Sequence, residues 1–130
     1  MFQISQEQYD ALNRQAWRDF VMRAGVYFSA RYPDGIPGVA PERFEEFLRD
    51  AQRRAEPYGV EMEYAVVRYS HLMLLLGNDF DTDPHRPEFR EVLDETDADD
   101  NERMDYLLER AQEPATPTEA SPGTASPEDA

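Results

Sequence analysis

The chain has 130 residues, and its 28 acids and 13 bases give it a formal net charge of −15. This length allows one compact domain, and the acidic charge argues against nucleic acid and anionic membrane surfaces as partners. The absence of cysteine excludes disulfides, zinc sites built on thiolates and a cysteine nucleophile.

The first helix is predicted over residues 6–31. Ser5 is a suitable N-cap, and Gln8, three residues later, completes a capping box. Apolar residues then recur at three- and four-residue steps, as in an amphipathic helix. This stripe consists of Tyr9, Leu12, Ala16, Phe20, Ala24 and Tyr27, widened by Trp17, Val21 and Phe28. The proline- and glycine-rich residues 32–38 end the helix because they favour turn geometry.

The second helix is predicted from Pro41, which suits a first helical turn, to about Gly59. Its polar face carries two pairs at i,i+4 spacing, Glu45 with Arg49 and Asp50 with Arg54. The third helix is predicted over residues 61–76, with Gly77 as its C-cap. Because this helix is apolar on two nearly opposite faces, we expect it to be the central helix of the domain.

A short helix over residues 88–93 and a last helix over residues 101–112 follow, and Asp99 caps the last one. Residues 113–130 are rich in Pro, Glu, Ser and Thr and have no large apolar side chain, so we expect a disordered acidic tail. The sequence thus predicts an all-α fold, an irregular bundle of four to five helices over residues 1–112.

Three aspartates at alternate positions, Asp79, Asp81 and Asp83, resemble the start of a calcium-binding loop. The sixth position of such a loop needs glycine and here holds Pro84, and the twelfth needs a bidentate glutamate and holds Arg90. We therefore interpret the aspartates as loop and cap residues whose carboxylates accept hydrogen bonds from nearby backbone amides.

His71 lies one helical turn from Val67 and from Leu75, which favours a hydrogen-bonded histidine at the edge of the core over a catalytic base. The chain contains no glycine-rich phosphate loop, nucleophile elbow or pair of metal-binding histidines. We therefore expect a protein that is not an enzyme and that holds no metal or cofactor. An enzyme that uses the aspartates of residues 79–83 is the least favoured alternative.

Seven tyrosines, seven phenylalanines and one tryptophan give the chain side chains that suit interfaces as well as cores. Trp17, at the margin of the first stripe, is the leading candidate for an anchor that faces a partner, and a core tryptophan is the alternative. Tyr9 and Tyr64 are further candidates. Residues 78–112 hold 13 acids and four arginines, which adds three acidic candidates for partner binding: Asp97, Asp99 and Asp100.

Three stretches of the sequence resemble a known group of proteins: Ile4-Ser5-Gln6-Glu7-Gln8, the turn Tyr58-Gly59-Val60, and Leu76-Gly77-Asn78-Asp79-Phe80-Asp81 followed by Pro84 and Pro87. Over residues 1–112 the chain is similar to small acidic helical proteins encoded in type VI secretion clusters beside spike proteins and toxic effectors. Because these motifs are structural signals, the resemblance implies no site residues. It implies an adaptor or co-chaperone that holds an effector, or its loading chaperone, before export.

The expected partner is therefore another protein: an effector, an effector-loading chaperone or a toxin. An immunity protein is the main alternative function, since a small acidic protein can cover the basic active site of a nuclease toxin. The first residues lack a positively charged segment followed by an apolar one, and the longest apolar run, Leu72 to Leu76, is too short to span a membrane. We therefore expect a cytoplasmic protein.

Overall fold

The computed structural model describes residues 5–113, which contain five α-helices and no strand. The helices are α1 (Gln6–Arg31), α2 (Phe44–Ala55), α3 (Glu63–Leu76), α4 (Pro87–Leu93) and α5 (Asp100–Gln112). Single turns of 3-10 helix cover Pro41–Arg43, Glu56–Tyr58 and Phe80–Thr82. The predicted all-α bundle is therefore confirmed. The predicted disordered tail lies outside the described residues, except for Glu113.

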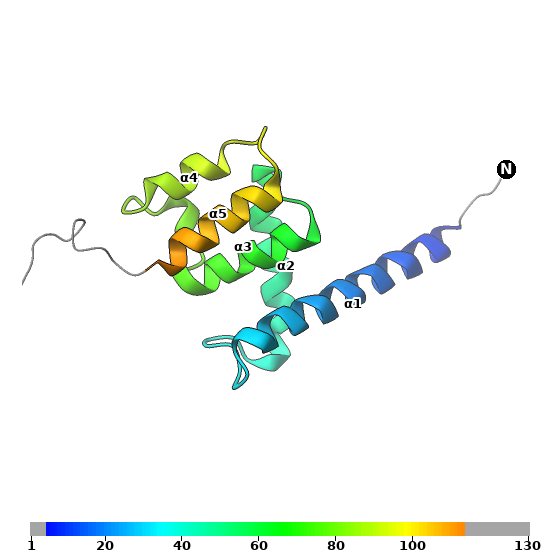
Figure 1. Cartoon of the computed structure of the whole chain (residues 1–130). Coiled ribbons are helices and arrows are strands. Elements are labelled where there is room, and N and C mark those ends of the chain that lie inside the picture. The colour runs from blue at the N-terminus through cyan, green and yellow to red at the C-terminus, as the bar shows by residue number, and fades with distance from the viewer. Residues whose placement is uncertain (1–4, 114–130) are drawn as a thin grey trace, which may run out of the picture.

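Four of the helices pack into a bundle that has α3 at its centre (Figure 1). α3 packs against both α2 and α5, and α4 packs against α5 and against the turn Phe80–Thr82. Ala65, Tyr69 and Leu72 of α3 are completely buried. The prediction that the helix with two apolar faces is the central one is confirmed.

The two halves of α1 have different surroundings. Its apolar face is buried from Phe20 to Phe28, whereas residues Gln6–Ala16 project away from the bundle and each of their side chains is exposed (Figure 1). We call residues Gln6–Ala16 the α1 arm. The predicted apolar stripe of this helix is therefore buried only in its second half, and its first members are exposed to solvent: Tyr9, Leu12 and Ala16.

An aromatic cluster around His71 of α3 holds the second half of α1. Phe28 is 2 % exposed, and its ring centre lies 5.6 Å from that of His71 and 5.8 Å from that of Phe44. The hydroxyls of Tyr27 and Tyr32 form hydrogen bonds with the two ring nitrogens of His71, at 2.8 and 3.0 Å. We call these five residues the His71 joint. The joint fixes the direction in which the α1 arm leaves the bundle.

The start of α3 is capped by a residue of another helix. α3 begins at Glu63, two residues later than predicted, and its N-cap residue, Met62, makes no capping hydrogen bond with its side chain. The Asp100 carboxylate, in the first turn of α5, accepts hydrogen bonds from the backbone N–H groups of Glu61 and Met62, at 3.1 and 3.2 Å. Burial by itself would raise the pKa of Asp100, but backbone N–H groups outweigh burial and lower this pKa below its usual value.

Asp100→Ala is expected to destabilise the fold by about 1–2 kcal/mol, because it removes the acceptor for two backbone N–H groups. Since folding lowers the pKa of Asp100, its contribution is present above the ordinary carboxyl pKa and is lost as the pH falls through the lowered value. Urea unfolding should compare this variant with Asp97→Ala, which changes an exposed aspartate of the same segment. A cost no greater than that of Asp97→Ala would contradict the capping role.

Candidate functional site

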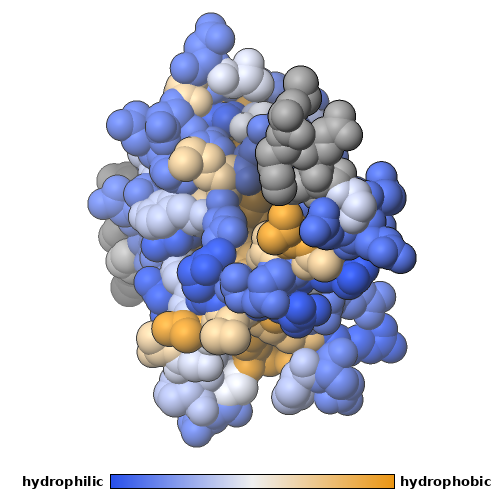
Figure 2. Space-filling model, turned by 90° about the vertical axis from the view of Figure 1, so that its right-hand side faces the viewer, coloured by the Kyte–Doolittle hydropathy of each residue, from blue (hydrophilic) through white to orange (hydrophobic). Residues whose placement is uncertain are grey.

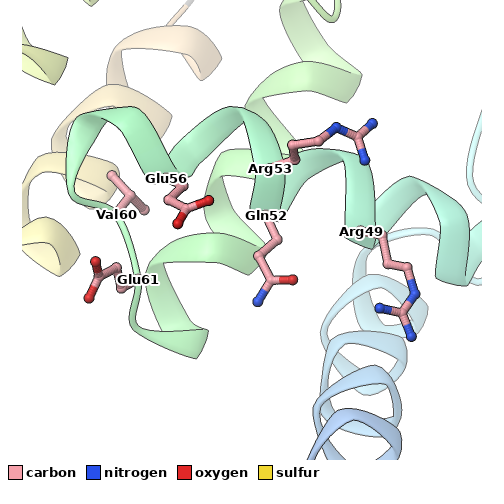
Figure 3. Close-up of a pocket in the computed structure, with 6 residues that line it drawn as sticks. All are labelled: Arg49, Gln52, Arg53, Glu56, Val60 and Glu61. Carbon is pink, nitrogen blue, oxygen red and sulfur yellow. The ribbon is translucent and has the colours of Figure 1, made fainter.

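The surface beside the α1 arm is hollowed into a groove, which we call the α1 groove. It consists of two hollows of about 370 and 360 Å³ that share Arg49, Gln52 and Glu61 among their lining residues. The α1 side is formed by Asn13, Ala16, Trp17 and Phe20. The opposite side is formed by α2, the turn after it and the first half of α3, with Arg53, Glu56, Val60, Glu63 and Val66. Figure 3 shows the larger of the two hollows, in which Arg49 lies nearest α1 and Val60 and Glu61 lie at the opposite end.

The α1 groove carries charges of both signs. Three of its charged residues belong to ion pairs with neighbours: Arg49 with Glu45, Arg53 with Asp50, and Glu63 with Arg23. Within residues 5–113, Glu56 and Glu61 form no ion pair. Figure 2, which shows the side toward which α1 points, has a mostly hydrophilic surface interrupted by smaller hydrophobic areas. The groove therefore combines apolar lining residues with charged ones, among them the unpaired acids Glu56 and Glu61.

Trp17 joins α1 to α2 at the edge of the groove. Its indole N–H donates a hydrogen bond to the Glu45 carboxylate, and the Arg49 guanidinium lies over its ring, 4.0 Å from the ring centre. The Trp17 side chain is partly buried and also packs against Phe20. The structure thus gives Trp17 a role in holding α1 on α2. Its role as an anchor for a partner stays a prediction.

The two tyrosine candidates differ in the contacts that their side chains make with the rest of the protein. Tyr9, on the α1 arm, is 55 % exposed. Tyr64 is 42 % exposed, but its hydroxyl donates to the Asp105 carboxylate at 2.7 Å, and the Arg68 guanidinium lies 3.3 Å from its ring centre. Tyr64 therefore helps to connect α3 with α5, whereas Tyr9 presents its ring to solvent.

The three acidic candidates lie between α4 and the first turn of α5. Asp97 is exposed, whereas Asp99 caps α5 by accepting from the backbone N–H groups of Asn101 and Glu102, as predicted. The Asp100 carboxylate accepts a hydrogen bond from the backbone N–H of Glu61, which lines the groove. The segment between α4 and α5 that carries the three aspartates therefore lies beside one end of the α1 groove. Of the six predicted partner-binding residues, only Trp17 lines the groove. Sequence reasoning missed Gln52, Glu56 and Glu61, since nothing separates them from other polar helix residues.

Each aspartate of the loop after α3 is bound by a different group: Asp79 by the Arg54 guanidinium at 2.9 Å, Asp81 by the Tyr58 hydroxyl at 2.5 Å, and Asp83 by the backbone N–H of His85 at 2.9 Å. Burial, followed by the hydrogen bond to Asp81, raises the pKa of Tyr58 to about 12. Within residues 5–113, no group of three acids or histidines is placed to hold a metal ion. The interpretation as loop chemistry fits Asp83, while the other two fix the loop to α2 and to the turn after it.

Comparisons with known protein families, with curated proteins and with solved structures find no match for this chain. In residues 5–113, none of the helices has the length and apolar character that a membrane span requires.

His71, the one histidine on a predicted apolar helix face, is 1 % exposed. Burial is the largest cause that lowers its pKa, to about 4, and the nearby charges of Arg31 and Arg68 lower it further. A neutral imidazole has one donor and one acceptor nitrogen, so the two tyrosine hydroxyls take opposite roles toward it. The prediction that His71 is a hydrogen-bonded histidine is therefore confirmed.

Protonation of His71 should make the fold less stable in acid. Its pKa is about 4 in the fold and 6.5 for an ordinary histidine, so the unfolded chain binds the proton more readily between these values. The stability that His71 adds is complete above pH 6.5 and declines by roughly 3 kcal/mol as the pH falls to about 4. The difference in unfolding free energy between the wild type and His71→Phe, measured in urea, should shrink over this range. A difference that stays constant would contradict this assignment.

Proposed function

We propose that the protein is a non-catalytic accessory protein that binds another protein, as an adaptor or co-chaperone for a type VI secretion effector. The observation behind this proposal is the α1 arm, a helical segment whose side chains are all exposed and which stands beside a groove. Protein binding is supported by the arm and the groove. The link to type VI secretion is supported only by the resemblance of the sequence.

The α1 arm has apolar side chains that a partner can cover. Tyr9 and Leu12 are 55 % and 57 % exposed. Covering apolar surface of this kind in a complex is favourable, and a few well-packed side chains supply most of the binding free energy of an interface. A helix that holds such residues in a regular array is also a common element for recognition by grooves and by other helices. The arm is therefore the part of the described surface best suited to bind protein.

The acidic second half of the chain supports a partner with a basic surface. Residues 78–112 hold 13 acids against four arginines. Arg103 is 3 % exposed, so its charge lies inside the protein. Two further arginines are paired with acids, Arg86 with Asp83 and Arg90 with Asp94. The exposed charge of this half is thus negative, which speeds association with a basic partner and contributes to partner choice.

The same acidic surface supports a second candidate function, an immunity protein that covers the basic active site of a toxin. This function predicts protection of cells that express the cognate toxin. It also predicts that binding depends on the acids near Asp97 rather than on the α1 arm.

The double variant Tyr9→Ala/Leu12→Ala tests the role of the arm. Its affinity for an effector that the wild type binds should fall by about 2 kcal/mol, roughly thirtyfold, when measured by calorimetry. Alanine has the highest helix propensity, so the arm keeps its helical form. Met22→Ala is the matched control, because Met22 is a 68 % exposed apolar residue of the same helix. Its position two residues before the buried Ala24 places it on the other face of α1.

Unchanged affinity of the double variant, together with loss of binding on charge reversal at Glu95 and Asp97, would contradict the proposed adaptor surface. That pair of results, with protection from a toxin, would support the immunity protein instead. Circular dichroism should first show that each variant has the helicity of the wild type.

A further inference from the structure

We propose that the α1 arm pairs with the α1 arm of a second copy of this chain, antiparallel and related by a twofold axis, so that each arm lies along the α1 groove of the other. This inference rests on the proposed function in one respect, namely that the arm binds protein. It identifies the occupant that covers the arm when no effector is bound.

One face of α1 runs from solvent into the core without a break. Tyr9, Asn13, Ala16, Phe20 and Ala24 follow one another at four- and three-residue steps, which places them on the same side of the helix. The last two are 5 % and 0 % exposed, whereas the first three are exposed. The bundle thus covers the second half of this face, and no residue from 5 to 113 covers the first half.

The arm is the free end of a longer helix. Helices in proteins are stabilised mainly by packing of their apolar face, and the bundle supplies this packing only to the second half of α1. Within the arm, the stabilising contacts are local: the capping box of Ser5 and Gln8, and a hydrogen bond from the Gln6 amide to Asp10 at 2.9 Å. A second helix packed along the exposed face would supply the tertiary contacts that most protein helices depend on.

The exposed faces of two arms fit each other when the two helices are antiparallel. In an antiparallel pair centred between Leu12 and Asn13, Tyr9 of one copy lies opposite Ala16 of the other copy. A large side chain then meets a small one, which allows two helices to pack closely. Because the axis is twofold, this contact is made twice.

The charges on the arm fit the same arrangement. Asp10 and Arg14 lie one turn apart on the same flank of the exposed face. In an antiparallel pair with a twofold axis, the same flank of each helix lies beside that flank of the other helix. Asp10 of each copy therefore faces Arg14 of the other copy. Within residues 5–113, Arg14 has no ion pair. Arg14 is thus available to a carboxylate of a second copy.

The arm is also a place where two copies can approach with little repulsion. The chain as a whole carries a charge of −15, so most surfaces of two copies repel each other. The α1 arm, by contrast, carries only two acids and one arginine, a net charge of −1. This low charge favours a second copy as the occupant of the arm.

The α1 groove provides space for the second arm. Asn13 and Ala16 belong both to the exposed face and to the lining of the groove, so a helix that packs on them lies in the groove. In the antiparallel arrangement the first turn of that helix reaches the level of Phe20, beside Gln52 and Glu61.

Sedimentation velocity of the full chain over a range of concentrations tests the pairing. The wild type should form a reversible dimer, and Asp10→Arg and Arg14→Glu should each raise its dissociation constant about tenfold or more. The double variant Asp10→Arg/Arg14→Glu restores the opposite charges and should return to within about threefold of the wild type. Arg110→Glu is the control, because Arg110 is exposed on α5 and its reversal changes the net charge as Arg14→Glu does.

A wild type that stays monomeric at every concentration would overturn the second copy as occupant, as would a dimer that is insensitive to Arg14→Glu. A double variant that dimerises no better than either single variant would overturn it as well. The proposed function fails separately: a dimer that behaves as predicted, with an effector that binds Tyr9→Ala/Leu12→Ala normally, supports this inference and contradicts the adaptor surface.

Discussion

The burial of Phe28 against His71 is the contact on which the shape of the molecule depends. α1 has 26 residues, about 39 Å at the rise of an α-helix, whereas α2 and α3, which it meets at the His71 joint, have 12 and 14. Tyr27 and Tyr32 fix the last turns of α1 on the ring nitrogens of His71. A helix of this length, held at its C-terminal end by shorter helices, extends beyond them, and the α1 arm is the result (Figure 1).

The opposite side of the α1 groove is held by contacts made across the bundle. Asp100 binds the backbone at Glu61, and the buried Arg103 guanidinium donates to the Leu93 carbonyl at 2.6 Å. Arg103 also packs beside Gly59, whose φ of +71° favours glycine in the turn before the groove. α5 therefore positions the segment that carries Val60 and Glu61, which line the groove in Figure 3. The projecting arm thus stands beside a surface fixed by several helices, an arrangement suited to binding another helix.

Sequence periodicity was sufficient to predict the helices and their order, because capping residues and glycines mark their ends, as Ser5 does for α1 and Gly77 for α3. It could not show that the α1 arm is exposed, since a stripe at helical spacing is the same whether or not a neighbour covers it. The cap of α3 by Asp100 joins positions 38 and 39 residues apart, a distance that local patterns do not reach. Trp17 could likewise be singled out by its residue type, but its hydrogen bond to Glu45 and its contact with the Arg49 guanidinium depend on how α1 meets α2.

Hydrogen exchange of the backbone amides in dilute solution tests most directly whether the His71 joint divides α1 into an anchored and a free half. The amides of residues 20–31 should exchange slowly, near the rate set by global unfolding, because the apolar face of this segment packs on the bundle. The amides of the α1 arm should exchange much faster, since only local helical contacts protect them. Equal protection along the whole of α1 in the monomer would contradict this account of the molecule.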